Sequence, residues 1–143
     1  MALALLLPLA PSLSDEARGK VTYVTDGDTI TVEGLGIVRL ADVDSPELAA
    51  TGGPEAKEYT RKQLFGKLVL LDLDNKTGLD RYGRKVCVVF LANANGTVGE
   101  IFNRMLVEAG HATVEDVKDN EFDPREGGQM QMRIRVPLPI RNL

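Results

Sequence analysis

Two aspartates at predicted turns are the first residues in this sequence that could do chemistry. Asp28 directly follows the tight-turn pair Asp26-Gly27, and Asp44 follows a predicted strand over residues 37–43. In an antiparallel meander both points fall at one end of the sheet, so we expect the carboxylates to be neighbours. Close carboxylates repel each other, and a cation relieves that repulsion. Because Ca²⁺ prefers oxygen ligands, we predict a site formed by Asp28, Asp44, the backbone carbonyl of Ser45 and waters.

Two arginines and a glutamate accompany these acids. Arg39 lies within the predicted third strand, and Arg84 lies at the start of the last predicted strand. Guanidinium groups bind phosphate oxygens through paired hydrogen bonds, and a carboxylate such as Glu47 orients or deprotonates an attacking water. Together with a metal ion, these groups are sufficient for phosphodiester hydrolysis.

Each pattern alone has a simpler interpretation. Asp-Gly-Asp-Thr is most often a solvated hairpin turn, and Ser-Pro-Glu is usually a loop or a helix start. His111 is interpreted as a surface or capping residue, and Cys87 as a thiol in the core. Lys57, Arg61 and Lys62 are interpreted as a solvated helix face, with contact to a nucleic-acid backbone as the alternative. The case for chemistry therefore rests on the combination.

The elements that must position these residues follow from the apolar pattern. Strands are predicted over residues 20–25, 29–33, 37–43, 67–73 and 84–91. One helix is predicted from Gly53 to Gly66, and another from a capping box at Thr97–Glu100 to Gly110. Open edges on five short strands would be a liability, which favours a closed barrel. The fold class is therefore β-rich α+β, a small closed five-stranded β-barrel with two to three helices.

Composition sets the outer limits. The 143 residues allow about one domain, and the single cysteine excludes a disulfide framework. The net charge of -4 and the pI of about 5.0 lack the bulk positive field of many nucleic-acid binders. We divide the chain into a signal-like or disordered N-terminus (1–17), a domain (18–117) and a tail of uncertain structure (118–143). Within the tail, the alternation over residues 130–136 suits either a strand or an unpaired segment.

In combination, the patterns resemble the staphylococcal nuclease (thermonuclease) family over roughly residues 19–114. The resemblance is carried by Asp26-Gly27-Asp28-Thr29, by Arg39 through Glu47, by Gly53-Pro54-Glu55-Ala56, and by Asp80-Arg81-Tyr82-Gly83-Arg84. It implies a barrel of the OB type. It also implies calcium ligands at Asp28, Asp44 and Ser45, phosphate-binding arginines at Arg39 and Arg84, and a catalytic glutamate at Glu47.

The resemblance implies a Ca²⁺-dependent nuclease that cleaves DNA and RNA with little sequence specificity and leaves 3′-phosphates. Three positions depart from the family pattern. Serine replaces threonine at position 45, the loop over residues 48–52 is short, and residues 113–118 lack the tyrosines that lie near a bound nucleotide. The last departure leaves base stacking from that side without a platform.

Two other functions remain open. One is a non-catalytic OB-type module that binds nucleic acid or a peptide, and the other is a structural adaptor with an arginine-rich tail over residues 133–141. We expect a monomer with no obligate protein partner and no membrane span in the mature chain. The signal-like N-terminus predicts secretion or a cell-envelope location, with the cytoplasm as the alternative.

Overall fold

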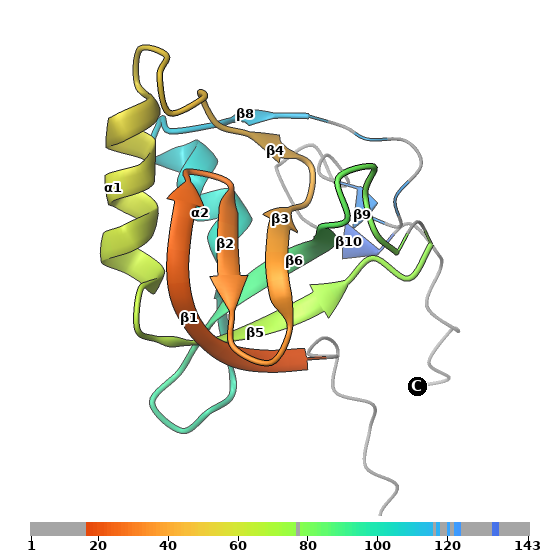
Figure 1. Ribbon diagram of the computed structural model, residues 1–143. Coiled ribbons are helices and arrows are strands. Elements are labelled where there is room, and N and C mark those ends of the chain that lie inside the picture. Colours follow the sequence, from red (N-terminus) through yellow and green to blue (C-terminus); the bar gives the residue numbers. More distant parts are fainter. Residues whose placement is uncertain are drawn as a thin grey trace, which may run out of the picture.

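A computed structural model describes residues 17–76, 78–115, 117, 120, 122–123 and 133–134. Its central feature is a closed β-barrel with two helices packed on it (Figure 1), which confirms the predicted α+β fold of the OB type. The strands are β1 (Ala17–Asp26), β2 (Thr29–Val32), β3 (Gly36–Leu40), β4 (Val43–Asp44), β5 (Leu68–Leu73), β6 (Lys85–Ala92), β7 (Val98–Ile101), β8 (Thr113–Val114), β9 (Phe122–Asp123) and β10 (Arg133–Ile134). The helices are α1 (Gly53–Leu64) and α2 (Phe102–Glu108).

The barrel closes through one parallel contact. Its strands follow the order β3-β2-β1-β5-β6, all antiparallel neighbours, and β3 pairs in parallel with β6 to complete the ring. Closure removes the open edges, as the sequence predicted. The interior is filled by alternate residues of each strand, including Val38, Leu40 and Cys87, all buried. Alternation therefore directs Arg39, between Val38 and Leu40, to the outer face.

The predicted third strand is interrupted. We expected one strand over residues 37–43, but β3 ends at Leu40 and β4 begins at Val43. Between them the backbone of Asp42 has φ of 56°, a left-handed conformation that Asp tolerates better than most residues. The turn redirects the chain, so that β4 leaves the barrel and pairs with β8.

Helix α1 begins and ends where predicted. Pro54 occupies its first turn and Glu55 complements the helix dipole there, while Gly66 follows the helix with positive φ. On its exposed face, Arg61 donates two hydrogen bonds to the Glu58 carboxylate, both at 2.7 Å.

The expected start of α2 is wrong. Residues 98–101 form β7, which pairs with β6, and the helix begins only at Phe102 without a side-chain cap. Gly99 explains the strand, because a Cβ there would lie 2.8 Å from the Leu91 carbonyl oxygen. The close approach of β6 therefore decides against the capping box that the local sequence suggests.

The chain beyond Val117 contributes to packing. Phe122 is fully buried and packs with Leu70, Val88 and Phe90 on the outer side of the barrel. Its strand β9 pairs with β10, so part of the alternating segment is a strand. The rest of the predicted tail and the signal-like segment, residues 1–16, lie outside the described residues. Neither helix among the described residues is long and apolar enough to cross a membrane.

Candidate functional site

The turn between β1 and β2 presents Asp28 at one end of the barrel. Helix α1 holds this turn in place, because the Thr60 hydroxyl of α1 donates a hydrogen bond to the Gly27 carbonyl at 2.7 Å. A Cβ at Gly27 would lie 2.7 Å from Ser45, so only glycine fits there. Asp28 itself accepts hydrogen bonds from the Thr29 hydroxyl at 3.0 Å and from the Ser45 amide at 2.8 Å. The predicted neighbours Asp28 and Ser45 are thus in direct contact.

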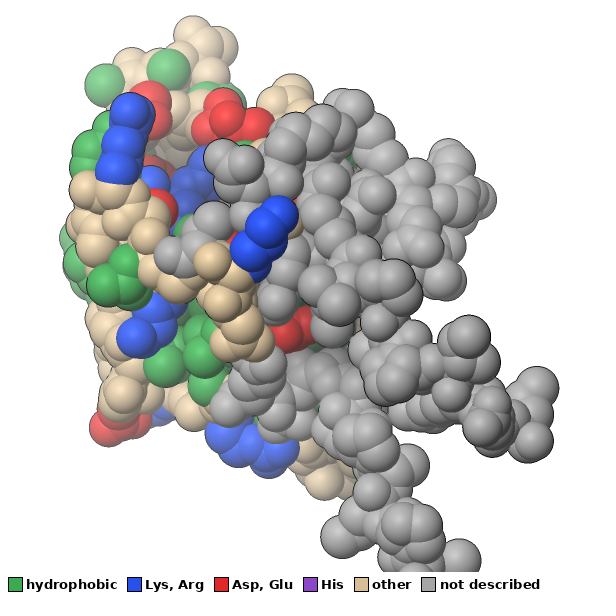
Figure 2. All heavy atoms as spheres, turned by 90° about the vertical axis from the view of Figure 1, so that its right-hand side faces the viewer, with side chains coloured by type: hydrophobic (Ala, Val, Ile, Leu, Met, Phe, Trp, Pro, Cys, Tyr) green, Lys and Arg blue, Asp and Glu red, His purple; other side chains and the backbone are tan. Residues whose placement is uncertain are grey.

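Arg39 extends from the outer face of β3 into this group of acids. Its Nη1 donates to the carbonyl oxygens of Leu40 and Val43, both at 2.6 Å. Its Nη2 lies 3.3 Å from Asp28 Oδ2 and 3.4 Å from Asp44 Oδ1. One nitrogen is therefore tied to the backbone while the other faces the two aspartates. Figure 2 shows blue and red side chains close together on this side of the molecule.

The acids nearest the turn carry an excess of negative charge. Burial and the neighbouring Asp28 carboxylate raise the pKa of Asp26 to about 6. The Asp28 amide also donates to Asp26 Oδ1 at 3.2 Å. The sequence pattern assigned Asp26 no role beyond the turn, although Asp26 lies only two residues before Asp28 and the two carboxylates could have been expected to interact.

The donors at this end fit Ca²⁺. Asp28 and Asp44 converge on one guanidinium nitrogen, so their oxygens lie close to one another. The Ser45 hydroxyl is buried, and no described residue hydrogen-bonds to it. All of these donors are hard oxygens, the ligands that Ca²⁺ prefers. No three His, Cys, Asp or Glu side chains among the described residues form a metal-binding group, so carbonyls and waters would complete the shell.

Glu47 lies in the loop after β4, three residues beyond Asp44. Its side chain is exposed, and within the described residues its carboxylate makes no hydrogen bond or ion pair. The loop backbone is tightly fitted, because a Cβ at Gly53 would overlap the Glu47 carbonyl group. The loop therefore brings Glu47 back against the start of α1.

Arg84 directly precedes β6, the strand that pairs in parallel with β3. Arg39 pairs in register with Val86, and Arg84 precedes Val86 by two residues. Its guanidinium does not contact the aspartates at the turn. Instead, its Nε donates to Asp80 Oδ2 at 2.7 Å, and its centre lies 5.1 Å from the ring centroid of Tyr82. The structure thus joins Asp28, Arg39, Asp44 and Ser45 directly, whereas Arg84 contacts Asp80 and Tyr82 in the loop before β6.

Asp42 is a buried residue to which the sequence assigned no role. Its Oδ1 accepts hydrogen bonds from the Val117 amide at 3.1 Å and from Asn120 Nδ2 at 2.6 Å. Its carbonyl accepts from the amide of Glu115 at 2.9 Å. The Asp42 turn separates Arg39 from Asp44, so the chain after β8 holds the segment that carries both. In the sequence, the only signal of this structural role was the position of Asp42 two residues before Asp44, and the pattern did not distinguish the roles of the two acids.

Asn103 supports the same turn from α2. Its Nδ2 donates to the carbonyls of Ala41 at 3.0 Å and Cys87 at 3.2 Å, while its Oδ1 accepts from the Val89 amide at 2.9 Å. Asn103 is fully buried in the apolar stripe of that helix. A buried amide with all three contacts satisfied fixes the helix against β6 and the turn.

Glu115 is a further acid that the sequence did not single out. Its Oε2 lies 3.8 Å from Arg39 Nη2. Glu115 therefore adds a third carboxylate around the same guanidinium.

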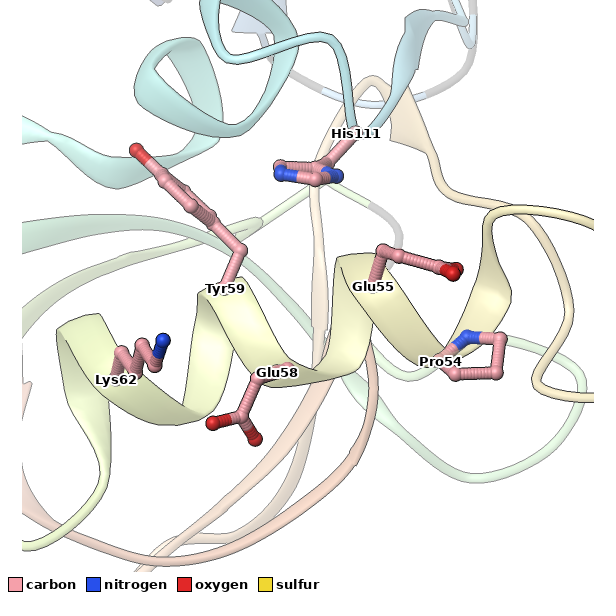
Figure 3. Close-up of a pocket in the computed structure, with 6 residues that line it drawn as sticks. All are labelled: Pro54, Glu55, Glu58, Tyr59, Lys62 and His111. Atoms are coloured by element: carbon pink, nitrogen blue, oxygen red, sulfur yellow. The ribbon is translucent and has the colours of Figure 1, made fainter.

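His111 belongs to a different part of the surface. Its amide donates to the Leu106 carbonyl at 3.0 Å and closes the end of α2, as the capping interpretation predicted. Its ring lies 4.9 Å from that of Tyr59, beside a hollow of about 410 Å³ along α1 (Figure 3). None of the predicted catalytic or metal-binding residues lines this hollow. Cys87, also predicted as a core thiol, is buried.

The arrangement agrees with a family comparison. Residues 37–132 match the family described as "Staphylococcal nuclease homologue". The chain belongs to the staphylococcal nuclease family. The match includes Arg39, Asp44 and Arg84 and extends to β9, beyond the segment over which the sequence patterns resemble the family.

Proteins from distant organisms are similar to this chain. An "Uncharacterized protein MJ1439" from Methanocaldococcus jannaschii is 32% identical over 122 residues, covering 67% of this chain and 58% of its own length. A "Micrococcal nuclease" from Shigella flexneri is 35% identical over 92 residues (62% and 51%). An "Endonuclease Htp3" from Saprolegnia parasitica is 36% identical over 97 residues (51% and 44%). The chain thus spans about half the length of these relatives.

Proposed function

We propose that this chain is a Ca²⁺-dependent nuclease that hydrolyses phosphodiester bonds in DNA and RNA with little sequence specificity. The observation that carries the proposal is the contact of one guanidinium, that of Arg39, with both Asp28 and Asp44. Family membership and the names of two relatives, a micrococcal nuclease and an endonuclease, support the same reaction class.

Substrate binding falls to the two arginines. Nη2 of Arg39 lies between the two aspartates while its Nη1 remains on the backbone carbonyls, so the guanidinium is oriented before substrate arrives. Arg84 offers a second cation from the loop before β6. Both would donate to the non-bridging oxygens of the scissile phosphate, where negative charge grows in the transition state.

Hydrolysis requires a water activated by Glu47. As the water oxygen bonds to phosphorus, Glu47 accepts its proton, and the bond from phosphorus to the 5′ oxygen breaks. The 5′ oxygen leaves with the electron pair of that bond and takes a proton from solvent, so the phosphate stays on the 3′ side. Glu47 is exposed, which gives water access to it.

Asp28, Asp44 and the Ser45 carbonyl would hold the metal ion. Bound Ca²⁺ would neutralise charge on the phosphate. The acidic pI of the chain gives no general attraction to nucleic acid, so binding depends on these local charges and is expected to be weak and salt-sensitive.

The proposal is tested by incubating the protein with plasmid DNA and with RNA, in Ca²⁺ or in a chelator. We expect cleavage of both in Ca²⁺ only, with 3′-phosphate ends. Glu47→Gln should reduce kcat by about 10²–10⁴-fold, whereas Glu33→Gln, a matched change at another exposed glutamate, should leave kcat unaltered.

Cleavage that persists in the chelator, or that survives Glu47→Gln, would contradict this mechanism. Tight binding of nucleic acid without turnover in Ca²⁺ would favour the non-catalytic module instead. Secretion and a monomeric state stay predictions, which N-terminal sequencing of the natural protein and light scattering would check.

A further inference from the structure

A row of exposed side chains crosses the outer face of the first three strands. Tyr23 of β1 pairs in register with Thr31 of β2, and Thr31 pairs with Ile37 of β3. The next residues along, Val24, Ile30 and Val38, are buried in the barrel interior. Because side chains alternate, the row of Tyr23, Thr31 and Ile37 points outward.

The row is apolar and open to solvent. Tyr23 is 58% exposed and Ile37 is 51% exposed. In Figure 1 the strands β1, β2 and β3 lie side by side at the front, and α1 borders them at the side of β1 without crossing them. Tyr23 and Ile37 therefore offer an aromatic ring and an aliphatic side chain to a ligand that lies across these strands.

The row continues directly from the proposed catalytic site. Ile37 precedes Arg39 by two residues on the same face of β3, about 7 Å along the strand. In the parallel register of β3 with β6, Val38 pairs with Lys85, so the residues just before them, Ile37 and Arg84, precede the same end of this pairing. Tyr23 lies two strands further away, about 10 Å from Ile37. A chain with its phosphate on the arginines therefore reaches the row within one or two nucleotides.

Cations lie at both ends of the row. Lys57 of α1 places its Nζ 5.7 Å from the centroid of the Tyr23 ring. At the other end, the guanidinium groups of Arg81 and Arg84 lie 4.8 Å and 5.1 Å from the Tyr82 ring. Apolar faces between cations match a strand that has flat bases and a charged backbone.

We propose that the row of Tyr23, Thr31 and Ile37 is a platform for the bases of single-stranded nucleic acid. This inference rests on the proposed function, because it assigns a base subsite to the same substrate. The base next to the scissile phosphate lies against Ile37, the following base stacks on Tyr23, and Lys57 contacts a neighbouring phosphate. Bases paired in a duplex do not offer their faces in this way, so the platform selects single strands.

The platform replaces one that the chain lacks elsewhere. The segment after α2 approaches Arg39 with Glu115, and residues 113–118 contain no aromatic side chain. Among the residues of β1, Tyr23 is the one with an aromatic ring. The direction of the bound strand therefore runs across the barrel, from the loop before β6 towards α1.

The test separates binding from turnover. Anisotropy of a labelled single strand of about eight nucleotides, measured in a chelator, reports binding alone. Tyr23→Ala should raise its Kd about tenfold, since one stacked base contributes roughly 1–3 kcal/mol. Tyr23→Phe should restore the affinity, because the ring and not the hydroxyl makes the contact. Phe65→Ala, at an aromatic residue 51% exposed beyond α1, is the matched control and should bind as the parent does.

Cleavage in Ca²⁺ supplies the second measurement. With the long strand, Tyr23→Ala should raise KM by the same factor. With a dinucleotide, which is too short to reach Tyr23, kcat/KM should stay within about twofold of the parent. An unchanged Kd for Tyr23→Ala, an equal loss in Phe65→Ala, or an equal loss on the dinucleotide would each overturn the platform. Tyr23-dependent binding by a parent protein that cleaves nothing would instead reject the proposed function and leave the platform standing.

Discussion

Arg39 on β3 and Arg84 just before β6 each contact an aspartate, yet they are held in different ways. Arg39 meets Asp28 from the β1–β2 turn and Asp44 from β4, both brought to it by the closed barrel, and its side chain is 16% exposed. Arg84 meets Asp80, four residues earlier in its own loop, and is 26% exposed. Tertiary structure therefore fixes the first arginine, and a local turn fixes the second. We therefore expect Arg39 to contribute to the stability of the fold, whereas Arg84 belongs to a local loop that can adjust to substrate.

Removing each cation tests this difference most strongly. Arg39→Met leaves buried Asp28 without its cationic partner and should lower the free energy of unfolding by about 2–4 kcal/mol. Arg84→Met affects a more exposed, local pair and should cost under about 1 kcal/mol. Urea denaturation of both variants gives the two values. Equal losses would show that the two arginines are held in the same way.

The Asp42 turn is expected to matter at an intermediate level. Asp42→Gly accepts the positive φ but removes the acceptor of Val117 and Asn120, so stability should fall by about 1–2 kcal/mol. Asp42→Asn keeps an acceptor and tolerates the same conformation, and should cost less than about 1 kcal/mol. Amide exchange at Val117 should accelerate in the glycine variant. If it did not, the chain after β8 would not depend on Asp42.

Asp80 gives the smallest effect, and pH reveals it. Burial tends to raise the pKa of Asp80, but hydrogen bonds from the Arg84 amide and side chain and from the Tyr82 amide outweigh it and hold the pKa below its usual value. A lowered pKa in the folded state contributes stability above the unfolded-state pKa of about 3.9. That contribution is lost as pH falls through the folded-state pKa.

The stability gap between the parent and Asp80→Asn should therefore be under about 1 kcal/mol near pH 6 and should shrink below about pH 4. Denaturation curves at both pH values measure the gap. A gap that is constant with pH would mean that Asp80 does not act as a charged partner of Arg84.

The sequence predicted what short-range patterns determine. The Asp-Gly-Asp turn, the strand around Arg39 and the helix from Gly53 to Leu64 follow from turn residues, alternation and the proline at the helix start. Because the order of three antiparallel strands fixes which ends meet, the contact of Asp28 with Ser45 was also predictable. The geometry of the arginine pair was not, since it depends on the parallel contact of β3 with β6.

The errors lie where tertiary contacts override a local pattern. Thr97–Glu100 satisfies a capping box, yet β6 recruits these residues as a strand. Alternation continues through Asp42, although its backbone turns there. Phe122 is a single apolar residue in a polar segment, so no periodicity announces that it is buried. Glu115 joins Arg39 only because β8 pairs with β4.

The most direct test of the central claim compares calcium binding after a change in each of the two Asp–Arg pairs. Isothermal titration of Ca²⁺ into the parent protein should show one site, and Asp44→Asn should weaken it at least about tenfold because a ligand loses its charge. Asp80→Asn, which alters the other pair, should bind Ca²⁺ as the parent does. A parent protein that binds no Ca²⁺, or an Asp44→Asn variant that binds it with unchanged affinity, would contradict the account.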